Sequence, residues 1–303
     1  MHIVKHRSIY FALIGVITLA AIASVAIFGL KASLEFTGGT LVEVSYEGTR
    51  PTHEALTQSF EAAGFEGFSL RETGDSGFTL RAQNLTTEQR TQLPTYFAHD
   101  GKAAQIRQLT EVGPTIGVEL RNKSLIALAL VLLCILLFIA FAFRKVSKPV
   151  SSWVYGFVAI VTLVHDVIVP VGFFAVLGYF TGAQVDTLFV TAILTVLGFS
   201  IHDTIVVFDR TRENLRLNQE HNRKEPFEVT AGRSLNQTLV RSVNTSLTVI
   251  ITLAVLYVFG PESTKPFSLT LLVGIIAGTF SSIALATPLL VVIEKWRGKK
   301  GSN

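Results

Sequence analysis

Two charged residues stand inside stretches that otherwise have the composition of membrane-spanning helices. Asp203 lies in the apolar run 188–208, and Arg241 lies near the start of the apolar run 238–259. A charge at bilayer depth costs roughly 2.5–3.5 kcal/mol on insertion scales, so each residue needs a partner or a function. Each lies within about two helical turns of the same polar side, so similar depths are expected. We therefore predict an ion pair between Asp203 and Arg241 that a proton on the carboxylate would break.

Polar residues also repeat along the run 238–259 at intervals of three and four. They are Thr238, Arg241, Thr245, Thr248 and Thr252. Residues at this spacing share one face of a helix, so they form a polar stripe. The stripe could line a file of water. Alternatively, the threonines could donate to carbonyls of their own helix or hold neighbouring helices. A role in proton transfer is favoured most for Thr245, one turn from Arg241.

A second candidate site is the dipeptide His165-Asp166, which Pro170 follows as an expected kink. Histidine titrates near neutrality, so this pair could extend a proton path, or it could pair with neighbours as a structural element. Ser200, His202 and Asp203 resemble a serine-hydrolase set. However, neighbours on one helix point about 100° apart and cannot converge as a triad. There is no HExxH motif either, so an enzyme is not expected.

The composition is that of an integral membrane protein: of 303 residues, 49% are hydrophobic and 16% charged, and the mean hydropathy is +0.49. The single cysteine, Cys134, excludes an internal disulfide and a thiolate metal cluster, and no cofactor is expected. Six runs reach the roughly 20 apolar residues that a bilayer requires: 9–30, 124–143, 153–177, 186–208, 238–259 and 267–293. The first run is too long for a signal peptide and no clear cleavage site follows it.

Basic residues fall on one side of these spans if the chain crosses six times. They are Lys5 and Arg7; Arg144, Lys145 and Lys148; Arg210, Arg212, Arg216, Arg223, Lys224 and Arg233; and Lys295, Arg297, Lys299 and Lys300. Positive charge marks the cytoplasm, so both termini are predicted inside. The segment 35–116 carries eleven acids and six bases, a net of five negative charges, and is predicted outside. Topology accounts for the basic residues, so a nucleic-acid partner is not expected.

The external segment alternates strand and helix patterns. The expected elements are a strand at 40–48, a helix at 52–64, a hairpin at 68–74 and 77–83, a helix at 86–101 and a strand at 103–113. This order predicts a small ferredoxin-like βαββαβ domain. Pro94 is expected to shorten or break the second helix. The chain thus divides into 1–34 with the first span, 35–120 as the extracytoplasmic domain, and 121–303 with spans two to six.

Small residues recur every fourth position in the last span. They are Gly274, Gly278, Ser282 and Ala286. Such a ridge lets another helix approach closely, either within the same bundle or from a partner subunit.

Several segments together resemble the SecF family of protein-export membrane subunits, which share the fold of resistance-nodulation-division (RND) transporters. They are LEFTGGT (34–40), VGPTIGVEL (112–120), VHDV (164–167), GFSIHDTIVVFDRTREN (198–214), LNQTLVRSVNTSLT (235–248) and GTFSSIALATPLL (278–290). They are spread from end to end in the order that the family keeps, so the resemblance covers the whole chain.

The resemblance implies a subunit of the bacterial inner membrane that works with SecD beside the SecYEG channel, and with SecA indirectly. Its other partners would be the exported unfolded polypeptide and membrane lipid. Proton flow would promote late steps of export, with Asp203, Arg241 and Thr245 matching the family's proton-path residues. Family members commonly have Asn before that acid, whereas this chain has His202.

Two other classes of function remain open. A half-size RND exporter of small molecules or lipids would require an apolar pocket in the external domain. In a non-transporting scaffold, the pair of Asp203 and Arg241 would be a permanent ion pair that only holds the helices together.

Overall fold

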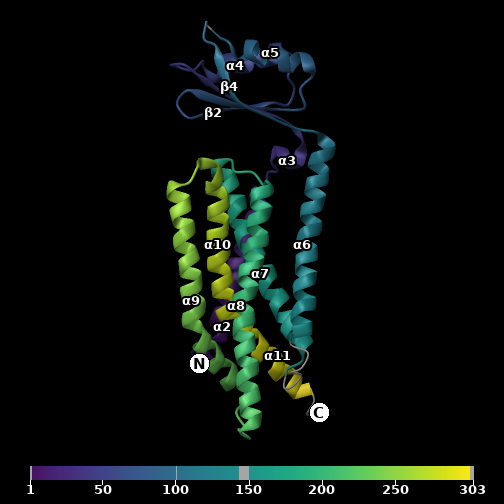
Figure 1. The fold of residues 1–303 in the computed structure, drawn as a ribbon, viewed down its shortest axis with the longest axis vertical. Helices are drawn as coiled ribbons and strands as arrows, with labels where there is room; N and C mark the ends of the chain where they lie inside the picture. The colour runs from purple at the N-terminus through teal and green to yellow at the C-terminus, as the bar shows by residue number, and fades with distance from the viewer. Residues whose placement is uncertain (1, 100, 143–149, 301–303) are drawn as a thin grey trace. The chain divides into compact units, whose positions relative to one another are not determined.

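The computed structural model describes residues 2–99, 101–142 and 150–300. The described helices that are long and apolar enough to cross a membrane number six (Figure 1). They are α2 (Arg7–Phe28), α6 (Pro114–Ala142), α7 (Ser152–Thr181), α8 (Thr187–Glu220), α9 (Phe227–Phe259) and a last span made of α10 (Lys265–Ser281), the π-helical turn η2 (Ser282–Ala286) and α11 (Thr287–Lys300). The chain divides into two compact units, Ala32–Leu125 and the remainder.

The helices are longer than the apolar runs. α8 continues to Glu220 and α9 begins at Phe227, whereas the apolar runs end at 208 and begin at 238. Hydropathy marks only the part of a helix that lies in lipid, and intrahelical pairs such as Arg216–Glu220 support the polar continuation. The end of the predicted run 124–143 and the basic residues Arg144, Lys145 and Lys148 lie outside the described residues.

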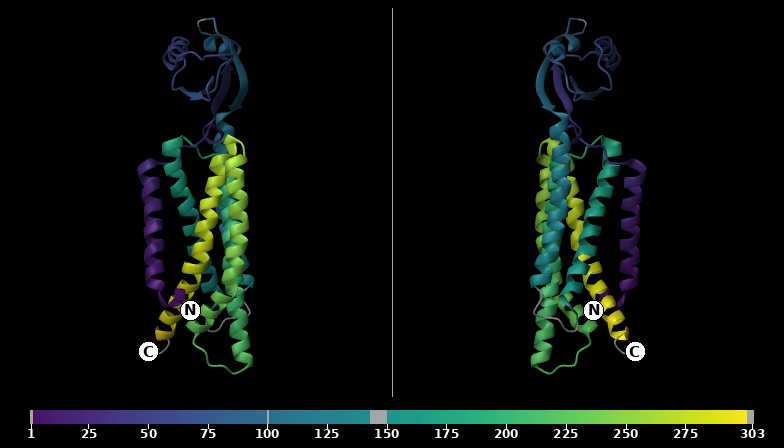
Figure 2. Two further views of the ribbon diagram at one scale, coloured as in Figure 1. Left: turned by 90° about the vertical axis from the view of Figure 1, so that its left-hand side faces the viewer. Right: turned by 90° about the vertical axis from the view of Figure 1, so that its right-hand side faces the viewer.

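α7, α8 and the last span form the interior of the helical unit, and α2 packs along α7 (Figure 2). The approach of α2 to α7 depends on Gly172. A Cβ atom on Gly172 would lie 2.5 Å from the Cα of Ala21 and 2.6 Å from its carbonyl oxygen. The two backbones therefore touch at this point, and only glycine leaves room for the contact.

The small-residue ridge of the last span packs against α8 of the same chain, which confirms the prediction of close helix packing. A Cβ atom on Gly274 would lie 2.3 Å from a methyl group of Val196, and one on Gly278 would lie 2.9 Å from the Cβ of Ser200. The ridge continues into the π-helical turn, where Ser282 is fully buried. The last span is thereby held against the helix that carries Asp203.

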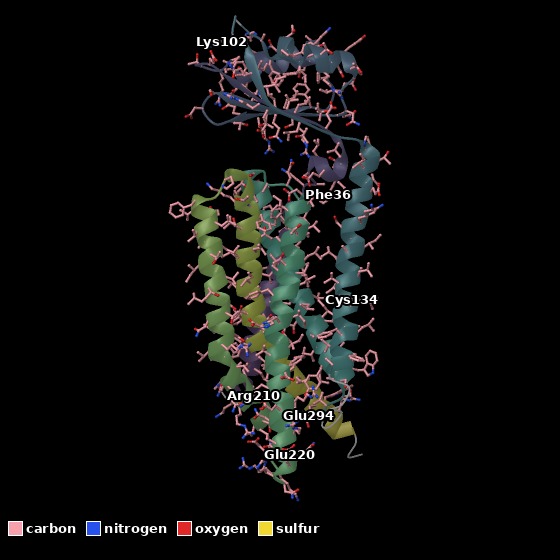
Figure 3. All side chains as sticks on the ribbon, viewed as in Figure 1. Phe36, Lys102, Cys134, Arg210, Glu220 and Glu294 are labelled. Carbon is pink, nitrogen blue, oxygen red and sulfur yellow. The ribbon has the colours of Figure 1, made fainter. Side chains whose placement is uncertain are left out.

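Both ends of the described chain lie at the same end of the helical unit (Figure 1). Charged side chains gather there, among them Arg210 and Glu220 of α8 and Glu294 of α11 (Figure 3). Glu228 of α9 joins three elements at this end: it accepts a 2.8 Å hydrogen bond from Arg7 and pairs with Lys295.

The unit Ala32–Leu125 contains a four-stranded antiparallel sheet in the order β2-β3-β1-β4. Its elements follow along the chain as β1 (Gly39–Tyr46), α4 (His53–Ala62), β2 (Ser69–Thr73), β3 (Gly77–Ala82), α5 (Thr87–Phe97) and β4 (Ala104–Val112). One face of the sheet packs on the two helices, and the core between them includes Val42, Leu80, Phe60 and Phe97.

Pro94 does not break its helix, because α5 continues through Pro94 to Phe97, although it ends before the predicted limit at 101. A capping box between Thr86 and Gln89 stabilises the first turn, and Leu93 and Phe97 are fully buried on either side of the proline. Burial of these side chains offsets the roughly 3 kcal/mol that an internal proline costs a helix.

Burial raises the pKa of Tyr46 to about 12, so its phenol stays protonated. The hydroxyl donates a 2.8 Å hydrogen bond to the carbonyl of Phe97, which ties β1 to the end of α5.

The chain enters and leaves this unit through two segments that touch. Gly38 has a φ of +76°, and a Cβ atom on it would lie 2.7 Å from the Cα of Pro114. A Cβ atom on Gly117 would in turn lie 2.8 Å from the amide nitrogen of Gly38. The start of α6 is therefore packed directly on the backbone of the short helix α3 (Leu34–Thr37) and the glycines after it.

Alanine at Gly38 is expected to destabilise the unit Ala32–Leu125 by about 3 kcal/mol or more, because positive φ and backbone overlap act together. Hydrogen exchange of the β1 and β4 amides in the whole protein measures the effect. Gly74→Ala is the matched control, since Gly74 has a φ of +59° and open space around it. It should lose only about 1 kcal/mol. Equal losses in the two variants would show that the contact with Pro114 contributes nothing.

Candidate functional site

Asp203 is buried inside the helical unit and is 2% exposed. α8 begins with Asp186 as its N-cap and presents Ser200, Asp203 and Thr204 on the same buried face. The Oγ of Ser246 on α9 donates a 3.4 Å hydrogen bond to Asp203. The Nδ1 of His202 lies 3.8 Å from the carboxylate, while the rest of that imidazole is largely exposed. A buried acid surrounded in this way is a candidate for binding a proton.

The face of α9 that packs against Asp203 carries two serines four residues apart, Ser242 and Ser246. Ser246 is 2% exposed and also lies 2.6 Å from the hydroxyl of Thr279 on α10. The hydroxyl of Ser242 faces Asp203 but forms no hydrogen bond in the part of the chain that the structure describes. α9 therefore meets Asp203 with hydroxyl groups and no charged group.

The predicted ion pair between Asp203 and Arg241 is not formed in this chain. Arg241 is exposed and has no ion-pair partner among the described residues. It precedes Ser242 by one residue, so its depth is similar to that of Asp203, as expected. However, one residue of helix rotates a side chain by about 100°, which carries Arg241 off the face that packs on α8.

The polar stripe of α9 also lies mainly on the exposed face. Thr238 is buried, but Arg241, Thr248 and Thr252 are exposed and Thr245 is half-buried. The hydroxyls of Thr245, Thr248 and Thr252 donate to backbone carbonyls of their own helix at 2.7–2.9 Å. Of the two alternatives, the structure has the threonines bonded to their own helix.

His165 and Asp166 form a second buried acidic centre between α7 and α8. His165 Nδ1 lies 2.8 Å from Asp166 Oδ1, and Ser200 Oγ donates to Asp166 Oδ2. Asp166 is fully buried, and the Nε2 of His165 has no hydrogen-bond partner in the described ranges. Ser200 engages Asp166, so it does not join His202 and Asp203 in a hydrolase triad.

Serines and threonines of four elements, α8, α9, α10 and η2, surround the two acids. Ser200 precedes Asp203 by one turn, and its carbonyl accepts a 3.4 Å hydrogen bond from Ser282 of η2. Ser282 also lies 2.9 Å from the hydroxyl of Thr204. Our sequence interpretation missed the hydroxyl residues of this cluster. They are Ser200, Thr204, Ser242, Ser246, Thr279 and Ser282. The four-residue spacing of Ser242 and Ser246 was the available signal.

The cluster holds two carboxylates without a lysine or arginine within ion-pair distance among the described residues. Each carboxylate is instead contacted by a serine hydroxyl and an imidazole. The same residues do not form a metal centre: no group of three His, Cys, Asp or Glu side chains with suitable positions exists in the described part of the chain.

Taken together, the spans, the inserted antiparallel sheet and the buried acids define a polytopic helical membrane protein with an α/β domain between its first two spans. Residues 92–296 match the family "Protein export membrane protein SecD/SecF, C-terminal". The chain is 42% identical to the protein translocase subunit SecF of Thermobaculum terrenum, over 98% of this chain and 94% of the relative. With SecF of Anaerolinea thermophila the identity is 34%, over 100% and 98%.

The fold also matches solved structures. A crystal structure of SecDF, a translocon-associated membrane protein from Thermus thermophilus, superposes with a TM-score of 0.80 at 31% identity. A structure of SecDF in a super-membrane-facing form gives a TM-score of 0.67. The chain spans 39% of the length of either SecDF chain. This chain belongs to the SecF family of protein translocase subunits.

Proposed function

We propose that this chain is the SecF subunit of a SecD–SecF pair that uses proton flow across the membrane to promote late steps of protein export by the Sec translocase. The observation that carries the proposal is the buried carboxylate of Asp203, whose hydrogen-bond and ion-pair partners in the described part of the chain are a serine hydroxyl and an imidazole. It lies in a chain that is similar to SecF along its whole length. The chain itself hydrolyses nothing and needs no cofactor.

Asp203 takes up and releases the proton, and its hydrogen bonding with the serines of α9 changes as a result. As a carboxylate, Asp203 accepts a hydrogen bond from Ser246; once protonated, it becomes a donor itself. Reversal of that hydrogen bond alters how α9 packs on α8, which is a two-state change. His165 and Asp166 are a second proton station in this proposal, and Ser200, one helical turn before Asp203 on α8, donates to Asp166.

Arg241 and Thr245 belong to the same proton path and lie on a surface of α9 that SecD covers in our proposal. An exposed guanidinium in a membrane span is unfavourable by several kcal/mol, so a carboxylate of SecD is its counter-ion in our proposal. The exposed threonines beside it belong to the same contact. The fusion of both parts in the relative named SecDF supports this association. The SecYEG channel, SecA indirectly, the exported polypeptide and membrane lipid are the further partners.

The protein lies in the bacterial inner membrane with both termini cytoplasmic and residues 35–120 outside. The support is that Lys5, Arg7, Lys295 and Arg297 belong to the terminal helices, which end at one end of the helical unit, and that Arg210 of α8 lies at the same end (Figures 1 and 3). The domain 35–120 has a ferredoxin-like fold in this proposal, because its βαββαβ elements pair in the order β2-β3-β1-β4.

A half-size exporter of small molecules or lipids is the alternative function. It requires an apolar pocket in the external domain. The cavity of about 510 Å³ in this unit is lined by Arg81, Gln83 and Asn84 as well as by Leu34, so it does not favour apolar cargo.

Arg241→Lys tests the proposal. Lysine keeps the positive charge but loses the planar fork that binds a carboxylate with two hydrogen bonds. We expect the variant to co-purify with SecD, while export of a secreted reporter falls about tenfold or more in cells that lack their own SecF. Arg216→Lys, an exposed residue of α8, is the matched control. Full export by Arg241→Lys, or a wild-type chain that never co-purifies with SecD, would contradict the proposal.

A further inference from the structure

The sheet of the unit Ala32–Leu125 has a second face, opposite the one on which α4 and α5 pack. Leu70 and Leu80 point toward the helices, so the residues that follow them, Arg71 and Arg81, point the opposite way. Arg107 joins them at the bulge between β1 and β4, where it donates a 2.6 Å hydrogen bond to Ser45. The open face therefore carries three arginines, one from each of β2, β3 and β4.

These arginines lack ion-pair partners among the described residues, unlike the arginines on the helix side. Arg50 pairs with Glu72, and Arg90 pairs with Glu111. All strand residues are described, and Glu43 is the single carboxylate that the strands place on the open face. The domain is acidic as a whole, so its charges are segregated and this face is basic.

Arg81 also lines the cavity of about 510 Å³, together with Ser69 and Asn84. One of its nitrogens donates a weak 3.4 Å hydrogen bond to the carbonyl of Ala32, which leaves the other donors of the guanidinium available. Burial and the charge of Arg71 lower the pKa of Arg81, so an anion beside it would relieve both effects.

We propose that this open face, with the Arg81 cavity at its end, binds the phosphate groups of anionic phospholipids. Arginine recognises phosphate through paired hydrogen bonds. The cavity is lined by Gly38 and Pro114, where the chain enters and leaves the domain. α2 ends at Phe28 and the apolar run of α6 begins at residue 124, so about ten residues separate Gly38 and Pro114 from the nearest membrane span. Lipid is therefore the phosphate source that covalent connectivity favours.

The test titrates the whole protein in detergent with short-chain phosphatidylglycerol. A fluorophore is attached at Thr73→Cys on the open face, or at Thr57→Cys on α4, in a Cys134→Ser background. The variant Arg71→Gln/Arg81→Gln/Arg107→Gln removes the three charges. The variant Arg50→Gln/Arg90→Gln/Lys102→Gln removes three charges elsewhere in the domain and serves as the control.

We expect a saturable response at position 73 only, about a hundredfold weaker in the open-face variant and unchanged in the control variant. This corresponds to roughly fivefold for each arginine near a charged lipid surface. An equal response to phosphatidylcholine, an equal response at position 57, or no loss in the open-face variant would overturn the proposal. So would a stronger response to free glycerol 3-phosphate, or to a glutamate-rich peptide, which would assign the face to a soluble phosphate or to a polypeptide.

Discussion

Asparagine in place of Asp203 is expected to leave the protein assembled in the membrane and to abolish its contribution to export. The amide has nearly the shape of the carboxylate and still accepts a hydrogen bond from Ser246, so packing of α8 on α9 is kept. It cannot take up a proton, however, and the proposed switch stays in one state. Export of a secreted reporter should fall to the level of cells without the protein, while the amount that co-purifies with SecD stays unchanged.

Asp209→Asn is the matched control for this prediction. Asp209 lies on the same helix, its side chain is largely exposed, and it is 3.9 Å from Arg212. It should retain full export. If Asp203→Asn also retained export, Asp203 would be a structural acid and the protein would fit the scaffold class. If the variant failed to assemble, the amide would have disturbed packing, and Asp203→Glu, which keeps a titratable group, would have to restore export.

Valine in place of Gly172 is expected to separate α2 from α7. The added side chain would begin 2.5 Å from the Cα of Ala21, and backbone atoms cannot move aside as a flexible side chain can. The free energy of unfolding should fall by about 3 kcal/mol or more, at or above the upper end of the range for overpacked cores. The thermal unfolding midpoint in detergent measures the loss, with size-exclusion chromatography as a check on aggregation.

Gly198→Val provides the control for the glycine-to-valine change. Gly198 also lies inside a spanning helix, but a Cβ atom on it would have no neighbour within 4 Å. Its unfolding midpoint should stay within a few degrees of the wild-type value. Equal shifts in the two variants would mean that the change acts through helix propensity and not through the contact between α2 and α7.

The length of the apolar runs was sufficient to place the six spanning segments, and hydrophobic periodicity was sufficient to place the elements of the external unit. The apolar runs failed at helix ends such as Glu220 and Phe227, because polar helices continue beyond the lipid. The sequence analysis also overestimated the effect of Pro94 on its helix. The cost of an internal proline is a local property, whereas the burial of Leu93 and Phe97 that offsets it depends on the tertiary fold.

For the candidate site, the sequence predicted the depth of the charged residues in the membrane but not the helix face on which they lie. The sequence gives the height of Asp203 and Arg241 along their helices, which is why a pair was expected. It does not say which face of α9 meets α8. The sequence analysis selected the stripe with Thr245 and Thr248, yet Ser242 and Ser246 occupy the buried face. Only packing against α8 and α10 distinguishes the two stripes.

The π-helical turn Ser282–Ala286 determines which way the side chains after it point around the axis of the last span. A wide turn holds one more residue than an α-helical turn, so the residues after it are rotated by about 100° relative to a regular helix. Lys295, beyond the turn, meets Glu228 from this rotated position. A change of this turn to regular geometry would swing Lys295 away from Glu228 and would at the same time move Ser282 from Thr204. The geometry of this one helical turn therefore couples the position of the buried hydroxyls around the acids to the charged contact near the chain ends.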